Sequence, residues 1–227
     1  FVRLHSGEPE QLKINYEASV EAEVSIIDAS ELAAVTVQSL DNATLPYLFP
    51  SRYCQSDMLG RLAWNKFGKI DNAYERVVAV TDWIYGNVEY VSGSTNANTS
   101  AYDTVTQRAG VCRDFAHLGV SLCRALNIPA RYFTGYAYQL DPPDFHACFE
   151  AFIGGRWTVF DATRLAPLNG LVRIATGRDA ADTSLATIFG PVKLKGMQVG
   201  CAFVGEGFKP LTRAELGHKG VTLEKVV

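Results

Sequence analysis

Residues 110–132 read GVCRDFAHLGVSLCRALNIPARY, and this stretch predicts a helix that is buried on one face. Its large apolar side chains recur at intervals of three and four residues, at Phe115, Leu118, Leu122 and Leu126. Asn127 and Pro129 end the pattern, because proline cannot continue a helix. Cys112 lies two residues after Gly110. We therefore expect a core helix whose first residue is a cysteine.

Two apolar runs further along, 146–153 and 156–162, are separated only by Gly154 and Gly155. Glycine tolerates positive φ, so this two-residue link predicts a β-hairpin. Ile153 then pairs with Arg156, and the register continues to Cys148 opposite Asp161 and His146 opposite Thr163. His146 and Asp161 become diagonal neighbours on one face, about 7–8 Å apart at the backbone. A one-residue slip of the turn would move Asp161 to the opposite face.

Together these positions suggest nucleophilic catalysis. The positive end of the helix dipole favours a thiolate at Cys112, which makes it the candidate nucleophile. Asp161 can fix one ring nitrogen of His146, which leaves the other nitrogen to act as a general base. Backbone N–H groups at the same helix start can hold the oxyanion of a tetrahedral intermediate. Cys112, His146 and Asp161 are thus the candidate catalytic residues.

Each of these residues also has an ordinary structural interpretation. A single cysteine in a helix is more often a small buried residue than a nucleophile. His146 can be a hydrogen-bonded strand histidine, and Asp161 a solvated carboxylate near a turn. The residues alone leave catalysis and structure about equally supported.

Other cysteines and histidines fit the site less well. His117 lies about 140° around the helix axis from Cys112, so it is a poor base. Cys123 lies about 16 Å further along the axis and is expected in the core. Cys148 is expected to pack beside the site. No CxxC or HxxxH spacing and no glycine-rich phosphate loop is present in the sequence, so neither a metal nor a cofactor is expected.

Composition favours a globular protein. The 227 residues are 48% hydrophobic and carry a formal net charge of −3, which argues against a nucleic-acid partner. No apolar run reaches about 18 residues, so no membrane span is expected. The odd number of scattered cysteines favours a reducing, cytoplasmic compartment, although a removed signal segment stays an alternative. Nothing in the sequence indicates an oligomeric state.

Periodicity predicts the remaining elements. Alternation over 14–24, and a similar run over 32–38, predict strands. Helices are expected at 57–67 and 71–85, the second capped by Asp71 and stopped by Gly86, and a short one at 100–108 begins with a capping-box spacing. A strand is expected at 131–137, and 92–100 is expected to be a loop at the rim of the site. The opening residues 1–4 also look like part of a strand.

Three blocks of this sequence, in this order, resemble the bacterial transglutaminase-like superfamily. They are residues 110–132, the stretch from His146 to Ala151, and the stretch from Trp157 to Thr163. By this resemblance the nucleophile, base and acid of the family match Cys112, His146 and Asp161. Many relatives have tryptophan two residues after the histidine, where this sequence has Cys148.

The resemblance implies an α+β fold with a papain-like cysteine-protease/transglutaminase core, in which a central helix packs on an antiparallel sheet. Residues 1–45 are expected to form a β-rich N-terminal segment, the end of a truncated β domain, and 46–227 the catalytic core. The resemblance also implies acyl transfer through a thioester. Hydrolysis of peptide or amide bonds is favoured, because family members in bacteria are protease-like. Amine transfer to protein glutamine and a non-catalytic interaction module are the alternatives.

Overall fold

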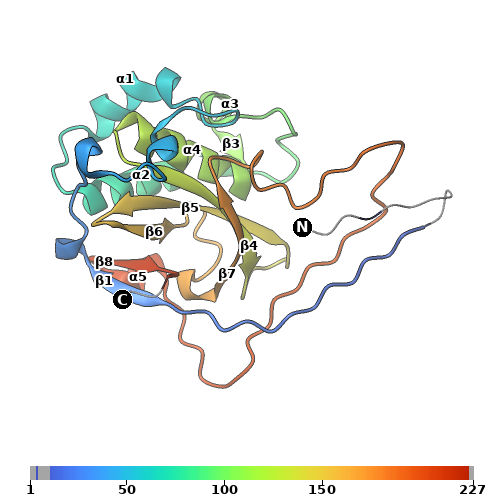
Figure 1. Ribbon diagram of the computed structural model, residues 1–227. Coiled ribbons are helices and arrows are strands. Elements are labelled where there is room, and N and C mark those ends of the chain that lie inside the picture. The colour runs from blue at the N-terminus through green and yellow to red at the C-terminus, as the bar shows by residue number, and fades with distance from the viewer. Residues whose placement is uncertain (1–3, 5–10, 225–227) are drawn as a thin grey trace.

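A six-stranded antiparallel sheet forms the centre of the computed structural model, which describes residue 4 and residues 11–224 (Figure 1). The strand order is β1-β8-β6-β5-β4-β7. The strands are β1 (Ser25–Asp28), β4 (Ala130–Ala137), β5 (Phe145–Ile153), β6 (Arg156–Phe160), β7 (Leu171–Gly177) and β8 (Lys219–Thr222). The expected α+β class and antiparallel sheet are confirmed.

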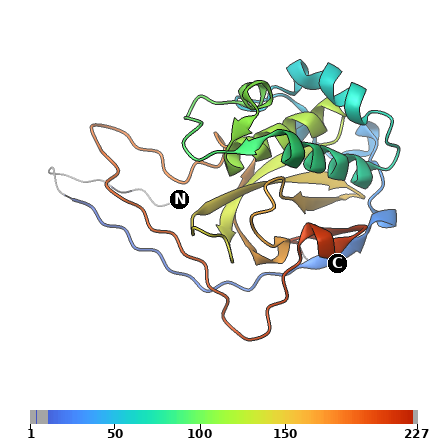
Figure 2. The same cartoon turned by 180° about the vertical axis from the view of Figure 1, so that it is seen from behind.

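Helices cover one face of this sheet, as Figure 1 and the reverse view in Figure 2 show. They are α1 (Ser56–Phe67), α2 (Ala73–Asn87), α3 (Ala101–Gln107) and α4 (Cys112–Ala125), while the single turn α5 (Arg213–Leu216) lies on the other side. Short 3-10 turns occupy Ala29–Glu31, Val37–Ser39, Leu45–Leu48 and Leu168–Gly170. No helix within the described residues combines the length and apolar character needed to cross a membrane.

The predicted central helix is confirmed as α4. The four side chains that set its period, Phe115, Leu118, Leu122 and Leu126, are all buried. A Cβ added at Gly119 would come within 2.4 Å of the Phe149 ring on β5, so glycine is required for α4 to pack this closely on the sheet. This packing sets how closely α4 approaches β5.

Other expectations hold with small shifts. Asn72 rather than Asp71 caps α2, since its side chain accepts a hydrogen bond from the Glu75 N–H at 3.0 Å. The helix continues through Gly86 to Asn87. The capping box at Ser100 and Asp103 is present at the start of α3.

The strands expected in the N-terminal segment are wrong. Residues 11–24 and 32–36 contain no strand, and Val37–Ser39 is a 3-10 turn; the strand of this region is β1, which pairs with β8. Exposed apolar side chains such as Ile14 and Tyr16 explain the failure, because alternation marks a strand only where one face is covered. The strand expected at 1–4 lies largely outside the described residues.

Candidate active site

Cys112 is the first residue of α4, as expected, and its side chain is partly exposed. A short parallel pair of strands, β2 (Glu89–Tyr90) and β3 (Ala109–Gly110), leads into the helix. The Val91 N–H donates to the Gly110 carbonyl at 3.0 Å. The residues before Cys112 are therefore tied to the segment that precedes the 92–100 loop.

The start of α4 is capped by an aspartate inside the helix. Asp114 is buried, and its carboxylate accepts a hydrogen bond from the Val111 N–H at 2.9 Å. Arg113 forms an ion pair with Asp114 at 3.1 Å and donates to the Asn96 carbonyl at 2.6 Å. Arg113 thus offsets the negative charge of Asp114 near Cys112, and it ties the 92–100 loop to the start of α4.

The hairpin has the predicted register. Gly154 and Gly155 have φ values of 60° and 73°, and Ile153 pairs with Arg156. Pairing ends at Phe149 and Phe160, so the expected continuation to Thr163 is wrong. The chain turns away there because the Asp161 carboxylate accepts hydrogen bonds from the Thr163 N–H and hydroxyl, at 2.8 and 2.7 Å.

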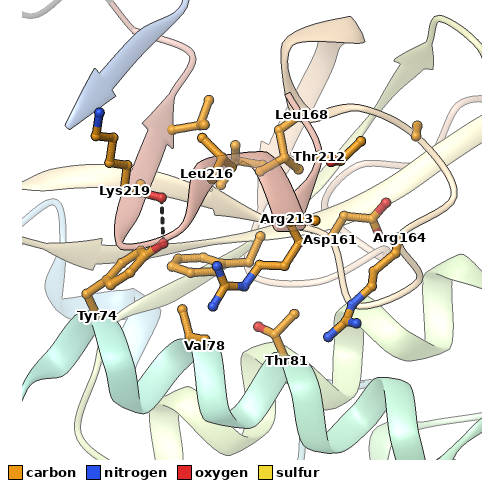
Figure 3. Close-up of a pocket in the computed structure, with 16 residues that line it drawn as sticks. Tyr74, Val78, Thr81, Asp161, Arg164, Leu168, Thr212, Arg213, Leu216 and Lys219 are labelled. Carbon is orange, nitrogen blue, oxygen red and sulfur yellow. Dashed lines mark hydrogen bonds between the residues drawn. The ribbon is translucent and has the colours of Figure 1, made fainter. Parts of the chain in front are cut away.

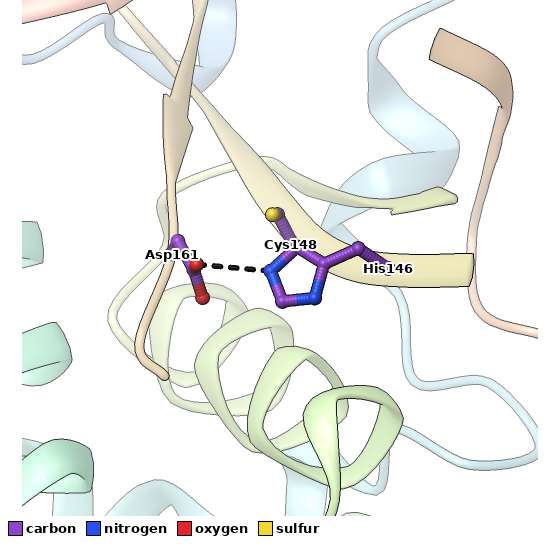
Figure 4. A group of neighbouring side chains, drawn as sticks. All are labelled: His146, Cys148 and Asp161. Atoms are coloured by element: carbon purple, nitrogen blue, oxygen red, sulfur yellow. Dashed lines mark hydrogen bonds and ion pairs between the residues drawn. The ribbon is translucent and has the colours of Figure 1, made fainter. Parts of the chain in front are cut away.

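His146 and Asp161 are nevertheless brought together (Figure 4). The distance from His146 Nε2 to Asp161 Oδ2 is 2.9 Å, and the side chains are only 1% and 2% exposed. The Cys112 thiol lies close enough to His146 to influence the pKa of the imidazole. Since Nε2 is taken by the carboxylate, Nδ1 is the nitrogen left for the thiol. The structure therefore joins all three residues that the sequence singled out.

The charges of this group follow from burial and pairing. Burial alone lowers the pKa of His146, but the neighbouring Cys148 and Asp161 side chains and the hydrogen bond to Asp161 outweigh it and raise that pKa. Burial alone raises the pKa of Asp161, but His146 and Thr163 lower it below the usual value. The pair is therefore an imidazolium and a carboxylate at neutral pH.

Cys148 lies beside this pair, on the same strand as His146 (Figure 4). Its thiol is buried, and burial raises its pKa to about 12, so Cys148 is uncharged at neutral pH. The charge that keeps His146 protonated therefore belongs to Asp161. His146, Cys148 and Asp161 each offer a possible metal-ligand atom, and these three atoms lie within 4.8 Å of one another.

The sequence did not reveal Tyr90, which lies beside Cys112. The β2–β3 pairing places Tyr90 opposite Gly110, and its ring centroid lies 5.9 Å from that of Phe115. The pKa of the Tyr90 phenol is raised, chiefly by burial and by the neighbouring Cys112 thiol, and the nearby backbone N–H of Cys112 partly opposes this. A two-residue strand is too short to leave a periodic signal, so pattern analysis could not find this contact.

The other candidates lie away from the group. His117 is buried between Tyr53 and Tyr132, and its Nε2 accepts a hydrogen bond from the Ala180 N–H at 3.1 Å. Burial lowers its pKa to about 3, which leaves it uncharged. Cys123 is fully buried in the core. These positions agree with the sequence expectation for both residues.

A cavity of about 280 Å³ lies on the other side of Asp161, between α2, α5 and the sheet (Figure 3). Tyr74, Val78 and Thr81 of α2 line one wall. Arg164 also lines it and is paired with Asp82 at 2.6 Å. Because neither Cys112 nor His146 is among its lining residues, this cavity lies behind the carboxylate and not at the thiol.

Comparisons with known proteins agree on the family to which this chain is similar. Residues 61–162 match the transglutaminase-like superfamily. The chain is 62% identical to a candidate cysteine protease from Cytophaga hutchinsonii, whose crystal structure matches with a TM-score of 0.86 over 88% of this chain and 70% of that one.

Mycobacterial relatives are more distant. An uncharacterized protein of Mycobacterium leprae is 27% identical over 174 residues, which are 73% of this chain and 61% of that protein. An uncharacterized protein of Mycobacterium tuberculosis is 42% identical over 60 residues, 26% of this chain and 19% of that one. The chain thus spans about three fifths of the length of the first. On its identity to the Cytophaga protein and the match over 61–162, the chain belongs to the transglutaminase-like superfamily.

Proposed function

We propose that the protein is a cysteine-dependent acyl-transfer enzyme that hydrolyses peptide or amide bonds. The observation that carries the proposal is the buried His146–Asp161 pair, with its second ring nitrogen toward the thiol at the start of α4. A base held by a carboxylate and facing a thiol at a helix N-terminus is the arrangement that activates a cysteine nucleophile. Its likeness to the candidate protease from Cytophaga hutchinsonii adds support.

In the proposed reaction, the Cys112 thiolate attacks the carbonyl carbon of an amide. His146 then gives its Nδ1 proton to the departing amine, and a thioester forms on Cys112. Water, deprotonated by the now neutral His146, attacks the thioester and releases the acid. Asp161 keeps Nε2 as the nitrogen that stays protonated throughout.

Tyr90 completes the proposed site as the oxyanion donor. The Tyr90 hydroxyl lies close enough to the backbone N–H and thiol of Cys112 for both to influence the pKa of the phenol. A substrate carbonyl oxygen that enters between the hydroxyl and this N–H receives two hydrogen bonds, which strengthen as the oxygen becomes negative. This gives Tyr90 a catalytic role that the sequence alone could not assign.

Two other functions remain as alternatives to hydrolysis. A primary amine in place of water gives glutamine-directed amine transfer, and a chain without activity is an interaction module. We favour a protein or peptide substrate, no cofactor, and a reducing, cytoplasmic setting in which the free Cys112 thiol persists.

Incubation with a mixed peptide library, with and without a primary amine, tests these alternatives. Mass spectrometry distinguishes cleavage or deamidation from incorporation of the amine. The proposal predicts cleavage or deamidation that Cys112→Ala abolishes. Incorporation as the main product supports amine transfer instead, and products that persist in Cys112→Ala, or no product in any sample, contradict the proposal.

A further inference from the structure

Three side chains with metal-binding atoms meet on one face of the sheet. His146, Cys148 and Asp161 are 1%, 1% and 7% exposed, and their ligand atoms lie within 4.8 Å of one another (Figure 4). His146 and Cys148 are two residues apart on β5, so they point to the same face. Asp161 is the first residue after β6, just beyond the last pair of the hairpin, Phe149 and Phe160. The group is therefore produced by the strand geometry and is not a chance surface cluster.

We propose that His146, Cys148 and Asp161 bind one borderline-soft divalent ion of the zinc class. Imidazole nitrogen, thiolate sulfur and carboxylate oxygen are the three protein ligands that zinc uses. Hard ions such as Mg²⁺ and Ca²⁺ prefer oxygen ligands, which only Asp161 supplies here. Three protein ligands leave a fourth position, which water can take.

The distances suit such an ion after small side-chain movements. Bond lengths of about 2.0–2.3 Å in a tetrahedral zinc site place ligand atoms roughly 3.3–3.6 Å apart. The 2.9 Å contact between Nε2 and Oδ2 must open slightly, and the wider separations, at most 4.8 Å, must close by about 1 Å. Binding replaces the Nε2–H···Oδ2 hydrogen bond with bonds from both atoms to the metal. One proton leaves Nε2, and one leaves the Cys148 thiol.

Asp161 also gives the ion a route to the group. This residue forms part of the wall of the cavity in Figure 3, and Cys112 is not among the residues that line that cavity. The ion can therefore approach the carboxylate without passing the thiol of Cys112. The cavity lining also carries three cations: Arg164 is paired with Asp82 at 2.6 Å, Arg213 lies 4.0 Å from the same carboxylate, and Lys219 is the third.

Metal binding has a consequence for the proposed reaction. An ion on Nε2 withdraws electron density from the ring and removes the Asp161 carboxylate from His146, so His146 becomes a weaker base. Zinc would then switch the enzyme off reversibly. This consequence rests on the proposed acyl-transfer function, whereas the binding itself does not.

Titration with Co²⁺ as a spectroscopic substitute for zinc tests the binding without any substrate. We expect one Co²⁺ per chain, with visible bands of tetrahedral cobalt and a near-ultraviolet thiolate-to-cobalt band, all displaced by Zn²⁺. Cys148→Ser keeps the side-chain size and should abolish the thiolate band. Since loss of an outer-shell partner alone typically lowers metal affinity about 10–100-fold, loss of this ligand should weaken binding by at least tenfold.

Cys112→Ala is the matched control, because it removes the nearest other thiol and leaves the proposed ligands in place. The bands should persist in this variant, which also keeps the test valid if Cys148→Ser does not fold. Bands that disappear in Cys112→Ala and persist in Cys148→Ser would assign the ion to the candidate nucleophile and overturn the proposal. Absence of any cobalt spectrum in the unmodified protein would overturn it equally, and neither result depends on whether peptides are cleaved.

Discussion

The two oxygens of Asp161 have different partners. Oδ2 holds His146 at 2.9 Å, while Oδ1 accepts hydrogen bonds from the N–H and hydroxyl of Thr163. A buried carboxylate with all three of these bonds is well compensated for its loss of water. The carboxylate is therefore fixed from one side by its own turn, and it fixes the imidazole on the other.

Replacement of Asp161 by asparagine should make the free energy of unfolding change less as the pH falls into the acid range. The folded pKa of Asp161 is lowered, so its stabilising contribution is present above about pH 4 and is lost as the pH falls through the folded pKa. His146 has a raised pKa and stays protonated across this acid range, so its charge does not add to the change. We expect Asp161→Asn to cost about 3 kcal/mol at neutral pH, since it leaves a buried imidazolium without its partner.

Urea denaturation of the unmodified protein and of Asp161→Asn, between about pH 3 and pH 7, measures the difference in their free energies of unfolding. The gap in the free energy of unfolding should narrow as the pH falls below the usual carboxyl range. A gap of constant size at every pH would mean that Asp161 does not carry a charge in the folded protein.

Tyr90 permits a test that separates an oxyanion donor from a packing residue. Tyr90→Phe keeps the ring near Phe115 and removes only the hydroxyl, so the melting temperature should change little. Loss of one oxyanion donor typically lowers kcat about 10²–10³-fold. We expect a fall of this order in kcat with little change in KM, on whichever amide substrate the peptide library identifies. An equal loss in Tyr90→Phe of stability and activity, or no loss of kcat, would argue against the role.

At the scale of elements, the hairpin turn decides the geometry of the site. Gly154 and Gly155 both have positive φ, but their surroundings differ. A Cβ at Gly154 would lie 2.3 Å from the Glu31 carbonyl oxygen, whereas a Cβ at Gly155 would meet nothing within 4 Å. The first glycine is thus required by space as well as by conformation.

Alanine substitution at the two glycines gives a matched pair. Gly155→Ala should cost about 1–2 kcal/mol, the usual penalty for an alanine at positive φ. Gly154→Ala should cost clearly more, because the backbone near Glu31 must also move. Thermal or urea denaturation of the two variants measures the difference, and equal losses would contradict the close approach seen at Gly154.

The success and failure of sequence analysis have physical causes at this scale. Gly154-Gly155 specifies a two-residue turn, and a turn fixes register, so the meeting of His146 with Asp161 could be predicted. The α4 start could be predicted because buried leucines leave a helical period. Tyr90 could not, because its position comes from a parallel contact between two residues and Ala109–Gly110. The point where the pairing of β5 with β6 ends could not be predicted either, because it depends on the hydrogen bonds between Thr163 and Asp161.

At the scale of the whole molecule, the N-terminal segment shares the sheet and the core of the residues that follow it. β1 pairs with β8, and Leu32 is fully buried. The Gly154 N–H donates to the Ala33 carbonyl at 2.8 Å, which joins this segment to the tip of the hairpin. The division into 1–45 and 46–227 stays a prediction, and these contacts favour cooperative unfolding of the two parts.

Leu32→Ala tests that coupling, with the exposed Val37→Ala as its control. Removal of a fully buried leucine costs about 2–5 kcal/mol, whereas truncation of a side chain that is 45% exposed should cost far less. We expect Leu32→Ala to lower a single melting transition for the whole chain. A separate early transition, with the main one unchanged, would mean that the segment folds independently of the sheet. Sequence analysis missed this coupling because partners far apart in the chain leave no local pattern.

The central claim is that His146 activates Cys112, and the rate of alkylation by iodoacetamide tests it most directly. Cys201 is an internal control in the same chain, since it is also partly exposed and has no histidine among the causes of its raised pKa. Peptide mapping after timed exposure near pH 6.5 gives both rates. We predict that Cys112 reacts much faster than Cys201, and that His146→Ala slows Cys112 alone. Equal rates for the two cysteines, or a Cys112 rate that His146→Ala leaves unchanged, would contradict the claim.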